Sequence, residues 1–231
     1  MNTQRQFLIR TRSTKALILT SILFFLGCFA STAQIVNTYY EKANIIYKGD
    51  MECTVNYSLH KSCSDVLLPS EILGTNHVGV RLGYGINKTF DLKVRYERFM
   101  QNNKDMSGDF NYVAISPRIT LKEDILSGAL DVSSYFSGNT HYEFIGPRLI
   151  LSFNISNRFD VTTGTKLDLA LNREHYSYWG GNLGCGISSD LNKWAIRPEI
   201  GATFNVRNVT NIIWNFGLAF VVNFNTCKIL Y

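Results

Sequence analysis

Apolar and polar residues alternate along most of the chain from residue 76 to residue 224. Alternation with a period of two is the pattern of β-strands, because successive side chains of a strand point to opposite faces. No long segment favours the helical period, so the sequence predicts an all-β fold. Nine segments show the alternation: 76–87, 90–97, 112–121, 130–136, 145–155, 159–171, 180–187, 194–204 and 212–224.

The connections between these segments alternate in length. Short connections are expected at 87–89, 156–158 and 192–193, and the intermediate link at 122–127 falls in the same series. Longer polar connections are expected at 100–109, 137–142, 172–178 and 205–211. Short turns on one rim and longer loops on the other are typical of an outer-membrane β-barrel.

The order of short and long connections requires a further strand before residue 76, because the chain must first reach the rim of long loops. Apolar residues alternate here as well, and they supply that strand: Met51, Cys53, Val55, Tyr57 and Leu59. Residues 61–75 then form the first outer loop. The sequence therefore predicts a closed, antiparallel, up-and-down transmembrane β-barrel of ten strands over residues 51–224, with a count of eight as the alternative.

Alternation alone also fits a soluble sandwich or a lipocalin-like barrel, but three features favour a barrel in lipid. The polar face is rich in Gly and Ser with isolated charges of both signs, as expected inside a narrow barrel. The strands are long enough for a tilted span of the hydrocarbon, which needs roughly nine to eleven residues. Aromatic residues near the strand ends predict girdles at the two interfaces: Trp179, Trp194 and Trp214, with Phe90, Phe144, Phe159, Phe204 and Phe224 in similar positions.

Three prolines fall within the predicted strands, at Pro117, Pro147 and Pro198. Proline removes a hydrogen bond from the ladder and is poorly placed in a central strand. We interpret the three sites as bulges or local bends that aim the next residue into the lumen. Those next residues are Arg118, Arg148 and Glu199.

The predicted lumen carries a network of charges: Arg81, Lys93, Arg95, Glu97, Arg118, Asp131, Arg148, Lys166, Asp168, Arg197 and Glu199. Buried charges must pair or stay hydrated. Arg118 is expected to face Asp131 across neighbouring strands. Arg148 opposes Lys166, so Asp168 on the diagonal is expected to intervene, and Glu97 has the same place beside Arg81 and Arg95. We expect this network to fill the lumen rather than to line a solute pathway, because ten strands leave little free bore.

The N-terminus has the order of a secretory signal. Residues 1–15 carry four basic residues, residues 16–30 are apolar, and Ser31-Thr32-Ala33 precedes Gln34. We expect a cleaved signal peptide at 1–33 and a periplasmic N-terminal segment at 34–50, with lipoprotein processing at Cys28 as the alternative. Without the signal the charge falls from +5 to 19 − 18 = +1. A near-neutral chain lacks the basic footprint of nucleic-acid binding.

Four cysteines follow the signal peptide, and Cys53 and Cys63 are close enough in sequence to form a disulfide. There is no CxxC or HExxH motif, so the sequence predicts neither a metal site nor a cofactor. The four histidines, at positions 60, 77, 141 and 175, fall in or beside the predicted outer loops. Ser177, His175 and Glu174 could be read as a catalytic trio, but sequence neighbours rarely orient as a triad and no nucleophile elbow is present. We therefore expect a protein without enzymatic activity.

These features together resemble the small bacterial outer-membrane β-barrel proteins. The resemblance covers roughly residues 45–224 and rests on the signal peptide, on Gly-rich strands such as Val78-Gly-Val-Arg-Leu-Gly-Tyr-Gly85, and on the closing strand that ends at Phe224. It implies an outer-membrane location, a lipid bilayer partner and assembly by the barrel-assembly machinery, which reads a terminal aromatic residue. Phe224 is in the lipid-facing frame, but seven residues follow it and Tyr231 has the opposite parity.

That family includes structural proteins, adhesins, narrow porin-like pores and a few lipid-modifying enzymes, so the resemblance indicates location more firmly than activity. We expect a structural or surface-interaction role, in which the outer loops contact an extracellular partner. Two alternatives stay open. One is a narrow pore for small polar solutes, and the other is an enzyme that modifies lipids of the outer leaflet.

Overall fold

The computed structural model describes residues 39–63, 74–101, 109–137, 140–171, 177–206 and 212–224. The chain divides into two compact units, Met1–Ala30 and Ser31–Tyr231. All described residues belong to the second unit. The signal peptide expected at 1–33 and the tail at 225–231 fall outside the described residues. Within the described ranges there is no helix of the length and apolarity that crossing a membrane would require.

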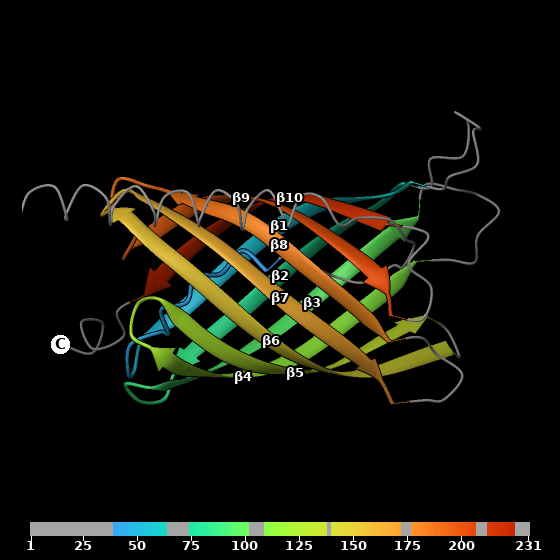
Figure 1. Ribbon diagram of the computed structural model, residues 1–231, viewed down its shortest axis with the longest axis horizontal. Helices are drawn as coiled ribbons and strands as arrows, with labels where there is room; N and C mark the ends of the chain where they lie inside the picture. The colour runs from blue at the N-terminus through green and yellow to red at the C-terminus, as the bar shows by residue number, and fades with distance from the viewer. Residues whose placement is uncertain are drawn as a thin grey trace, which may run out of the picture. The chain divides into compact units, whose positions relative to one another are not determined.

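The described residues form ten strands, and all neighbouring strands are antiparallel (Figure 1). In chain order they are β1 (Met51–Cys63), β2 (Gly74–Gly85), β3 (Phe90–Gln101), β4 (Phe110–Lys122), β5 (Leu126–Ser137), β6 (Thr140–Ser156), β7 (Phe159–Ala170), β8 (Tyr178–Ile187), β9 (Trp194–Asn205) and β10 (Ile212–Phe224). Each strand pairs with its sequence neighbours, and β1 pairs with β10, so the sheet closes on itself. The predicted ten-strand, up-and-down barrel is confirmed, and the count of eight is wrong.

The two rims of the barrel differ in their connections. We call the end with the connections 86–89, 123–125, 157–158 and 188–193 the turn rim, and the opposite end the loop rim. The long connection expected at 137–142 is wrong, because β5 and β6 pair as far as Ser137 and Thr140 and leave only two residues between them. The loop expected at 61–75 is shorter too, because β1 extends to Cys63 and β2 begins at Gly74.

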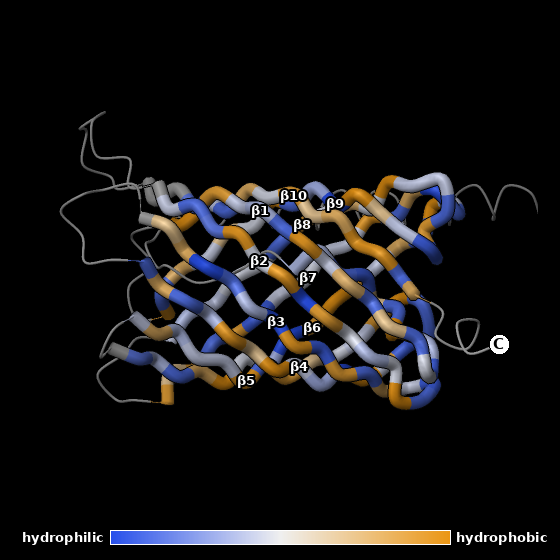
Figure 2. Tube along the Cα trace, turned by 180° about the vertical axis from the view of Figure 1, so that it is seen from behind, coloured by the Kyte–Doolittle hydropathy of each residue, from blue (hydrophilic) through white to orange (hydrophobic). Residues whose placement is uncertain are grey.

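The alternation in sequence corresponds to an outward apolar face and an inward polar face. Figure 2 shows apolar and polar positions succeeding one another along the strands. On β1, Val55 is 57% exposed, whereas Thr54 is fully buried in the lumen. Every one of the ten strands carries at least one exposed large apolar side chain, and the buried residues of the same strands are largely polar or charged. The barrel is thus the reverse of a soluble protein, in which apolar groups are the ones most often buried.

The three strand prolines do not form the expected bulges. The register of β4 on β5 is the same on both sides of Pro117, and Pro147 and Pro198 likewise leave the register of their strands unchanged. The ladder merely skips two pairs beside each proline, because the missing N–H removes a donor there. The register shifts that do occur lie near the turn rim, between Thr120 and Lys122 and between Asn154 and Ser156.

The disulfide expected between Cys53 and Cys63 is wrong. The two residues lie on the same strand, ten positions apart, and Cys53 is a free thiol. At a rise of about 3.3 Å per residue their Cα atoms are roughly 33 Å apart, whereas a disulfide needs about 4.4–6.8 Å. Closeness in sequence misleads here because an extended strand carries the second cysteine away from the first.

The periplasmic N-terminal segment expected at 34–50 is described from residue 39 on, and residues 39–46 lie within the barrel. Tyr39, Tyr40, Glu41, Ala43 and Ile46 are all at least nine-tenths buried. Near the turn rim the chain leaves the interior, because Tyr47 is 73% exposed and Gly49 donates a backbone hydrogen bond to Gly85. We call residues 39–46 the lumen segment.

Candidate functional site

The lumen of the barrel holds a dense network of buried charges. Every charged residue predicted for the lumen is less than 9% exposed. A water-filled bore would leave such side chains accessible to solvent. The part of the lumen that holds these charged residues is therefore filled by protein. The residues in question are Arg81, Lys93, Arg95, Glu97, Arg118, Asp131, Arg148, Lys166, Asp168, Arg197 and Glu199.

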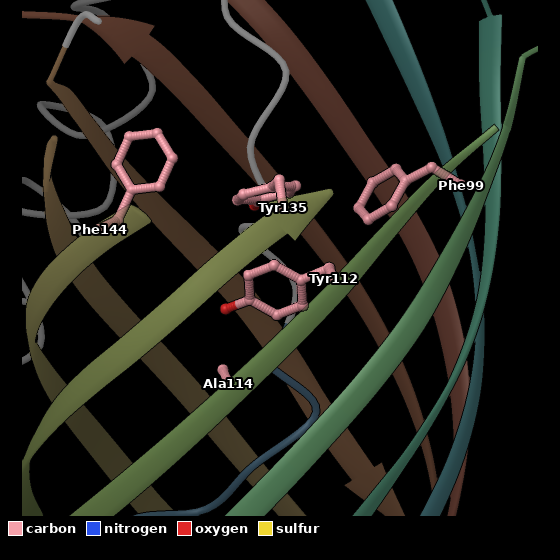
Figure 3. Close-up of a cluster of buried hydrophobic side chains, with 5 residues drawn as sticks. All are labelled: Phe99, Tyr112, Ala114, Tyr135 and Phe144. Atoms are coloured by element: carbon pink, nitrogen blue, oxygen red, sulfur yellow. The ribbon is translucent and has the colours of Figure 1, made fainter. Parts of the chain in front are cut away.

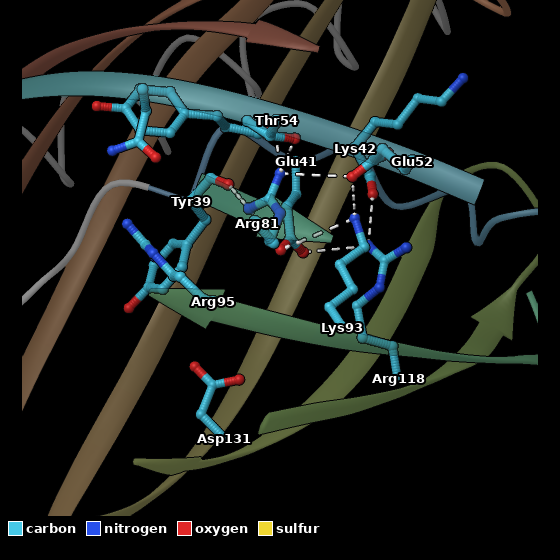
Figure 4. Close-up of polar contacts among 12 residues, drawn as sticks. Tyr39, Glu41, Lys42, Glu52, Thr54, Arg81, Lys93, Arg95, Arg118 and Asp131 are labelled. Carbon is cyan, nitrogen blue, oxygen red and sulfur yellow. Dashed lines mark hydrogen bonds and ion pairs between the residues drawn. The ribbon is translucent and has the colours of Figure 1, made fainter. Parts of the chain in front are cut away.

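Glu41 of the lumen segment is the centre of this network (Figure 4). One carboxylate oxygen, Oε1, lies 2.8 Å from Arg81 Nη1 on β2 and 3.9 Å from Lys93 Nζ on β3. The other oxygen, Oε2, lies 3.2 Å from Arg118 Nη1 on β4 and 3.2 Å from Arg148 Nη1 on β6. Four cations from four strands therefore converge on one carboxylate. We call these four side chains the cationic cradle.

The electrostatics of Glu41 follow from this setting. Burial disfavours the ionised carboxylate, but the attraction of the four cradle cations outweighs it, so the pKa of Glu41 lies well below its usual range. The carboxylate is therefore held in its charged form, which is the form the cradle binds.

Four acidic residues of the network were missing from the predicted set: Glu41, Glu52, Asp91 and Asp160. Asp91 accepts from Arg118 Nε at 2.9 Å, and Asp160 pairs with Arg197 through two hydrogen bonds of 2.9 and 2.6 Å. Asp91 and Asp160 stand on the inward parity of their strands, so the alternation could have placed both in the lumen. Glu41 precedes the first strand, and no periodic signal marks it.

The predicted pairings are partly right. Arg118 is opposite Ala129, not Asp131, and its partners are Asp91 and Glu41, so the expected Arg118–Asp131 pair is wrong. Arg148 does oppose Lys166, as expected. Lys166 Nζ lies 2.7 Å from the Asp168 carboxylate and 3.1 Å from Asp131.

The second predicted like-charge pair, Arg81 and Arg95, also has carboxylate partners. Arg81 opposes Arg95, and Arg95 pairs with the diagonal residue Glu97. Arg81 turns instead to Glu41 and Glu52. Each member of the two like-charge pairs thus has a carboxylate partner, and Glu41 of the lumen segment is a partner of both Arg81 and Arg148.

The backbone of the lumen segment is held by side chains of the barrel rather than by a ladder. The Glu199 carboxylate accepts the N–H groups of Tyr39 and Tyr40 at 2.5 and 2.7 Å. Arg81 donates to the carbonyl oxygens of the same two residues. Further along, Ala43 N–H donates to Ser152 Oγ at 2.7 Å. These contacts satisfy peptide groups that would otherwise be buried without partners.

Glycines of the wall make room for the lumen segment. A Cβ atom on Gly217 of β10 would lie 1.6 Å from the Tyr40 hydroxyl oxygen, and one on Gly85 would lie 1.9 Å from the Tyr47 carbonyl oxygen. A side chain at either position would collide with the segment, so glycine is required by close approach. Tyr40 itself has φ 52°, in the left-handed region that costs a non-glycine residue on the order of 1–3 kcal/mol.

A histidine pair lies between the network and the loop rim. Nε2 of His60 on β1 and Nε2 of His77 on β2 are 2.7 Å apart, and His77 Nδ1 contacts the Glu97 carboxylate. Phe99 stacks on His77 with ring centroids 4.7 Å apart. The sequence placed both histidines in or beside the outer loops, whereas both lie buried inside the barrel. His175, Glu174 and the trio they would form with Ser177 are not testable, because residues 172–176 fall outside the described ranges.

Aromatic side chains form a cluster on the loop-rim side of the lumen. Phe99, Tyr112, Tyr135 and Phe144 pack together there, with Ala114 beneath them (Figure 3). The rings of Tyr112 and Tyr135 lie 4.6 Å apart between centroids. Phe144 was expected in the outer girdle, but it is only 5% exposed and points inward. Its outward neighbours in sequence are Glu143 and Ile145, so its parity is that of the lumen.

The three tryptophans lie near strand ends and are not buried. Trp179 and Trp214 are close to the loop rim, and Trp194 begins β9 at the turn rim. Trp179 is 42% exposed and donates its Nε1–H to Thr165 Oγ1 at 2.6 Å. Partly exposed rings at both rims have the placement expected for interface girdles.

Chemically, the four cations of the cradle hold one carboxylate, that of Glu41. Among the described residues, no group of three or more His, Cys, Asp and Glu side chains is arranged to hold a metal ion. The candidate site is therefore the cationic cradle with Glu41 in it.

Known structures with a similar fold include the outer-membrane channel from Pseudomonas putida F1, with TM-score 0.44, 10% identity, and coverage of 83% of this chain and 100% of that one. The translocator domain of the autotransporter NalP from Neisseria meningitidis has TM-score 0.41 and 8% identity, covering 76% and 89% of the two chains. The attachment invasion locus protein Ail of Yersinia pestis has TM-score 0.35 and 10% identity, covering 77% and 99%. No protein-family model and no curated protein matches the chain. Likenesses this weak carry no argument about function.

Proposed function

We propose that this protein is an integral β-barrel of the bacterial outer membrane, exported by its signal peptide, with a structural or surface-interaction role and no enzymatic activity. The observation that carries the proposal is the inverted barrel. Large apolar side chains are exposed on all ten strands, and the charged residues of those strands are largely buried. A soluble monomer rarely exposes a continuous apolar patch of more than a few hundred Å², whereas a bilayer requires one.

A non-conducting resting state is the second part of the proposal. Arg118 is 1% exposed, Lys93 is 1% exposed and Glu41 is 4% exposed, which is not expected beside a continuous water column. Ten strands enclose little free bore, and the lumen segment occupies part of it. The extracellular contacts would then be made by the outer loops, and assembly would use the barrel-assembly machinery.

The enzymatic alternative gains no support from the two buried histidines. His60 and His77 lie inside the lumen rather than on the outward surface, where a lipid substrate would approach. Overexpression is therefore expected to leave the lipid profile of the outer membrane unchanged, and altered lipid A or phospholipid would argue for the enzyme.

The proposal is tested by reconstitution of the chain from residue 34 into liposomes. We expect the protein to float with the vesicles after an alkaline carbonate wash and to give no steady current in planar bilayers. Recovery in the soluble fraction without detergent would contradict the membrane location. A stable single-channel current from the unmodified chain would contradict the closed lumen and favour the narrow pore.

A further inference from the structure

We propose that the cationic cradle is a binding site for a carboxylate-bearing solute and that Glu41 occupies this site as an internal ligand. The inference deepens the proposed function, because it assigns a ligand class to the lumen of the barrel. It rests on the contacts of Glu41 and on the way in which the lumen segment is held.

The first argument is that the four cationic side chains of the cradle all come from the wall. Arg81, Lys93, Arg118 and Arg148 come from four strands, and each is 3% exposed or less. Each also has a carboxylate partner on the wall: Glu52 for Arg81 and Lys93, Asp91 for Arg118 and Asp131 for Arg148. Four cations therefore face three wall carboxylates, and Glu41 is the fourth. Loss of the Glu41 carboxylate would leave one positive charge of the cradle uncompensated, while Arg81 and Arg118 would keep their wall carboxylates and their bonds to backbone carbonyls of the lumen segment.

The second argument is geometric. The two oxygens of Glu41 each face two cations, at 2.8 and 3.9 Å for one oxygen and at 3.2 and 3.2 Å for the other. One of these contacts is a hydrogen bond, from Arg118 Nη1, and the other three are ion pairs, so two separated oxygens each face two cations. The cradle therefore suits a carboxylate better than a compact halide ion.

The third argument is that the ligand is held by contacts that can be exchanged. Among the described residues, the first ladder contact after the lumen segment is the bridge between Lys48 and Gly85, beyond its end. Inside the lumen, side chains such as Glu199 and Ser152 bind its peptide groups. The left-handed backbone of Tyr40 costs free energy that the surroundings must offset. A solute with a carboxylate would replace the Glu41 carboxylate without any change in the wall.

The most direct test is chemical rescue of Glu41→Ala in the full mature chain folded in detergent micelles. The substitution removes Cγ and the carboxylate, which together correspond in size to acetate. We expect a loss of resistance to urea, because the cradle becomes uncompensated. Sodium acetate is then expected to reverse at least half of the decrease in the urea midpoint of unfolding. Equal concentrations of sodium chloride or acetamide are expected to reverse much less of it.

Glu123→Ala is the matched control, because Glu123 is exposed in the turn between β4 and β5 and lies outside the network. Its urea midpoint is expected to be the same in acetate and in chloride. If acetate and chloride act alike on Glu41→Ala, the cradle does not select carboxylates and the inference is overturned. The inference is also overturned if acetate raises the urea midpoint of Glu41→Ala and of Glu123→Ala by the same amount.

A second variant tests access to the site from solution. Deletion of residues 39–46 is expected to give a barrel that conducts in planar bilayers and prefers anions, and succinate is expected to block this current at concentrations at least tenfold lower than succinamide. Equal block by the two compounds, or a cation-selective current, would contradict the inference. Flotation of the same variant with liposomes tests the membrane location separately. If the variant floats but succinate does not block its current, the carboxylate site is refuted and the membrane location is not.

Discussion

Leu218 and Ala219 are neighbours on β10, yet they lie in opposite environments. Leu218 is 53% exposed on the outward face, and Ala219 is 2% exposed in the lumen. The outward face is continuous and apolar, so it needs no specific partner but needs a solvent of low polarity. The lumen is polar, so it needs every charge to meet a specific partner. The two faces should therefore respond differently to substitution: the outward face to depth in the membrane, and the lumen to the loss of single partners.

The largest effect is expected in the lumen, for Arg118→Ala. The substitution leaves Asp91 and Glu41 buried without one of their cations, and breaking a buried ion pair costs about 3–5 kcal/mol. Urea unfolding in detergent or liposomes measures the loss. Arg158→Ala is the control, because Arg158 is an exposed residue of the turn between β6 and β7. Equal destabilisation by the two substitutions would mean that the network contributes nothing specific.

A somewhat smaller effect is expected on the outward face, for Leu218→Arg at the middle of β10. A charged residue facing lipid costs about 2–4 kcal/mol at the midplane and about 0–1 kcal/mol near the interfaces. Ile155→Arg near the turn-rim end of β6 should therefore cost much less, although Ile155 is even more exposed, at 65%. Unfolding in liposomes distinguishes the two. If both substitutions are equally harmless, water rather than lipid surrounds the barrel.

Overpacking the contact between the wall and the lumen segment should lower the free energy of unfolding by about 1–3 kcal/mol, the usual cost of overpacking. Gly217→Val would place a side chain where the Tyr40 ring lies. Combined with Tyr40→Ala, which removes that ring, the substitution should cost much less than it does alone. Additive effects of the two changes would show that Tyr40 does not occupy the lumen in solution.

The smallest effect is expected at the loop rim. Arg98 and Asp109 form an ion pair of 2.7 Å, but their side chains are 56% and 39% exposed. Water and salt screen such a pair, so Asp109→Asn should leave the urea midpoint unchanged. A clear loss of stability would show that the loop rim is better shielded from solvent than the barrel indicates.

The sequence predicted the barrel well because its dominant signal is local. Strict alternation sets which residues face outward, and the order of short and long connections sets the number of strands. The predicted span of 51–224 coincides with the bounds of β1 and β10. The two extra strand ends, at Cys63 and Thr140, were missed because polar residues such as Lys61 and His141 interrupt the apolar alternation there.

The lumen was less predictable, because its contacts depend on register and on a segment without periodicity. Opposite residues such as Arg148 and Lys166 could be paired by counting from a turn. Arg118 and Asp131 could not, because β4 and β5 pair as close to the turn as Lys122 and Leu126 and their register then shifts between Thr120 and Lys122. Glu41 has no pattern around it, so only the folded barrel shows that the four cradle cations share one carboxylate.

The central claim is that the apolar face of the sheet contacts acyl chains. Spin labels placed singly at positions 218, 219, 220 and 221 of the protein in liposomes test it directly, by collision with oxygen, which concentrates in lipid, and with a water-soluble nickel reagent. We predict high oxygen and low nickel accessibility at 218 and 220, and low oxygen accessibility at the lumen positions 219 and 221. Nickel accessibility at 218 and 220 as high as on an exposed turn would contradict the account.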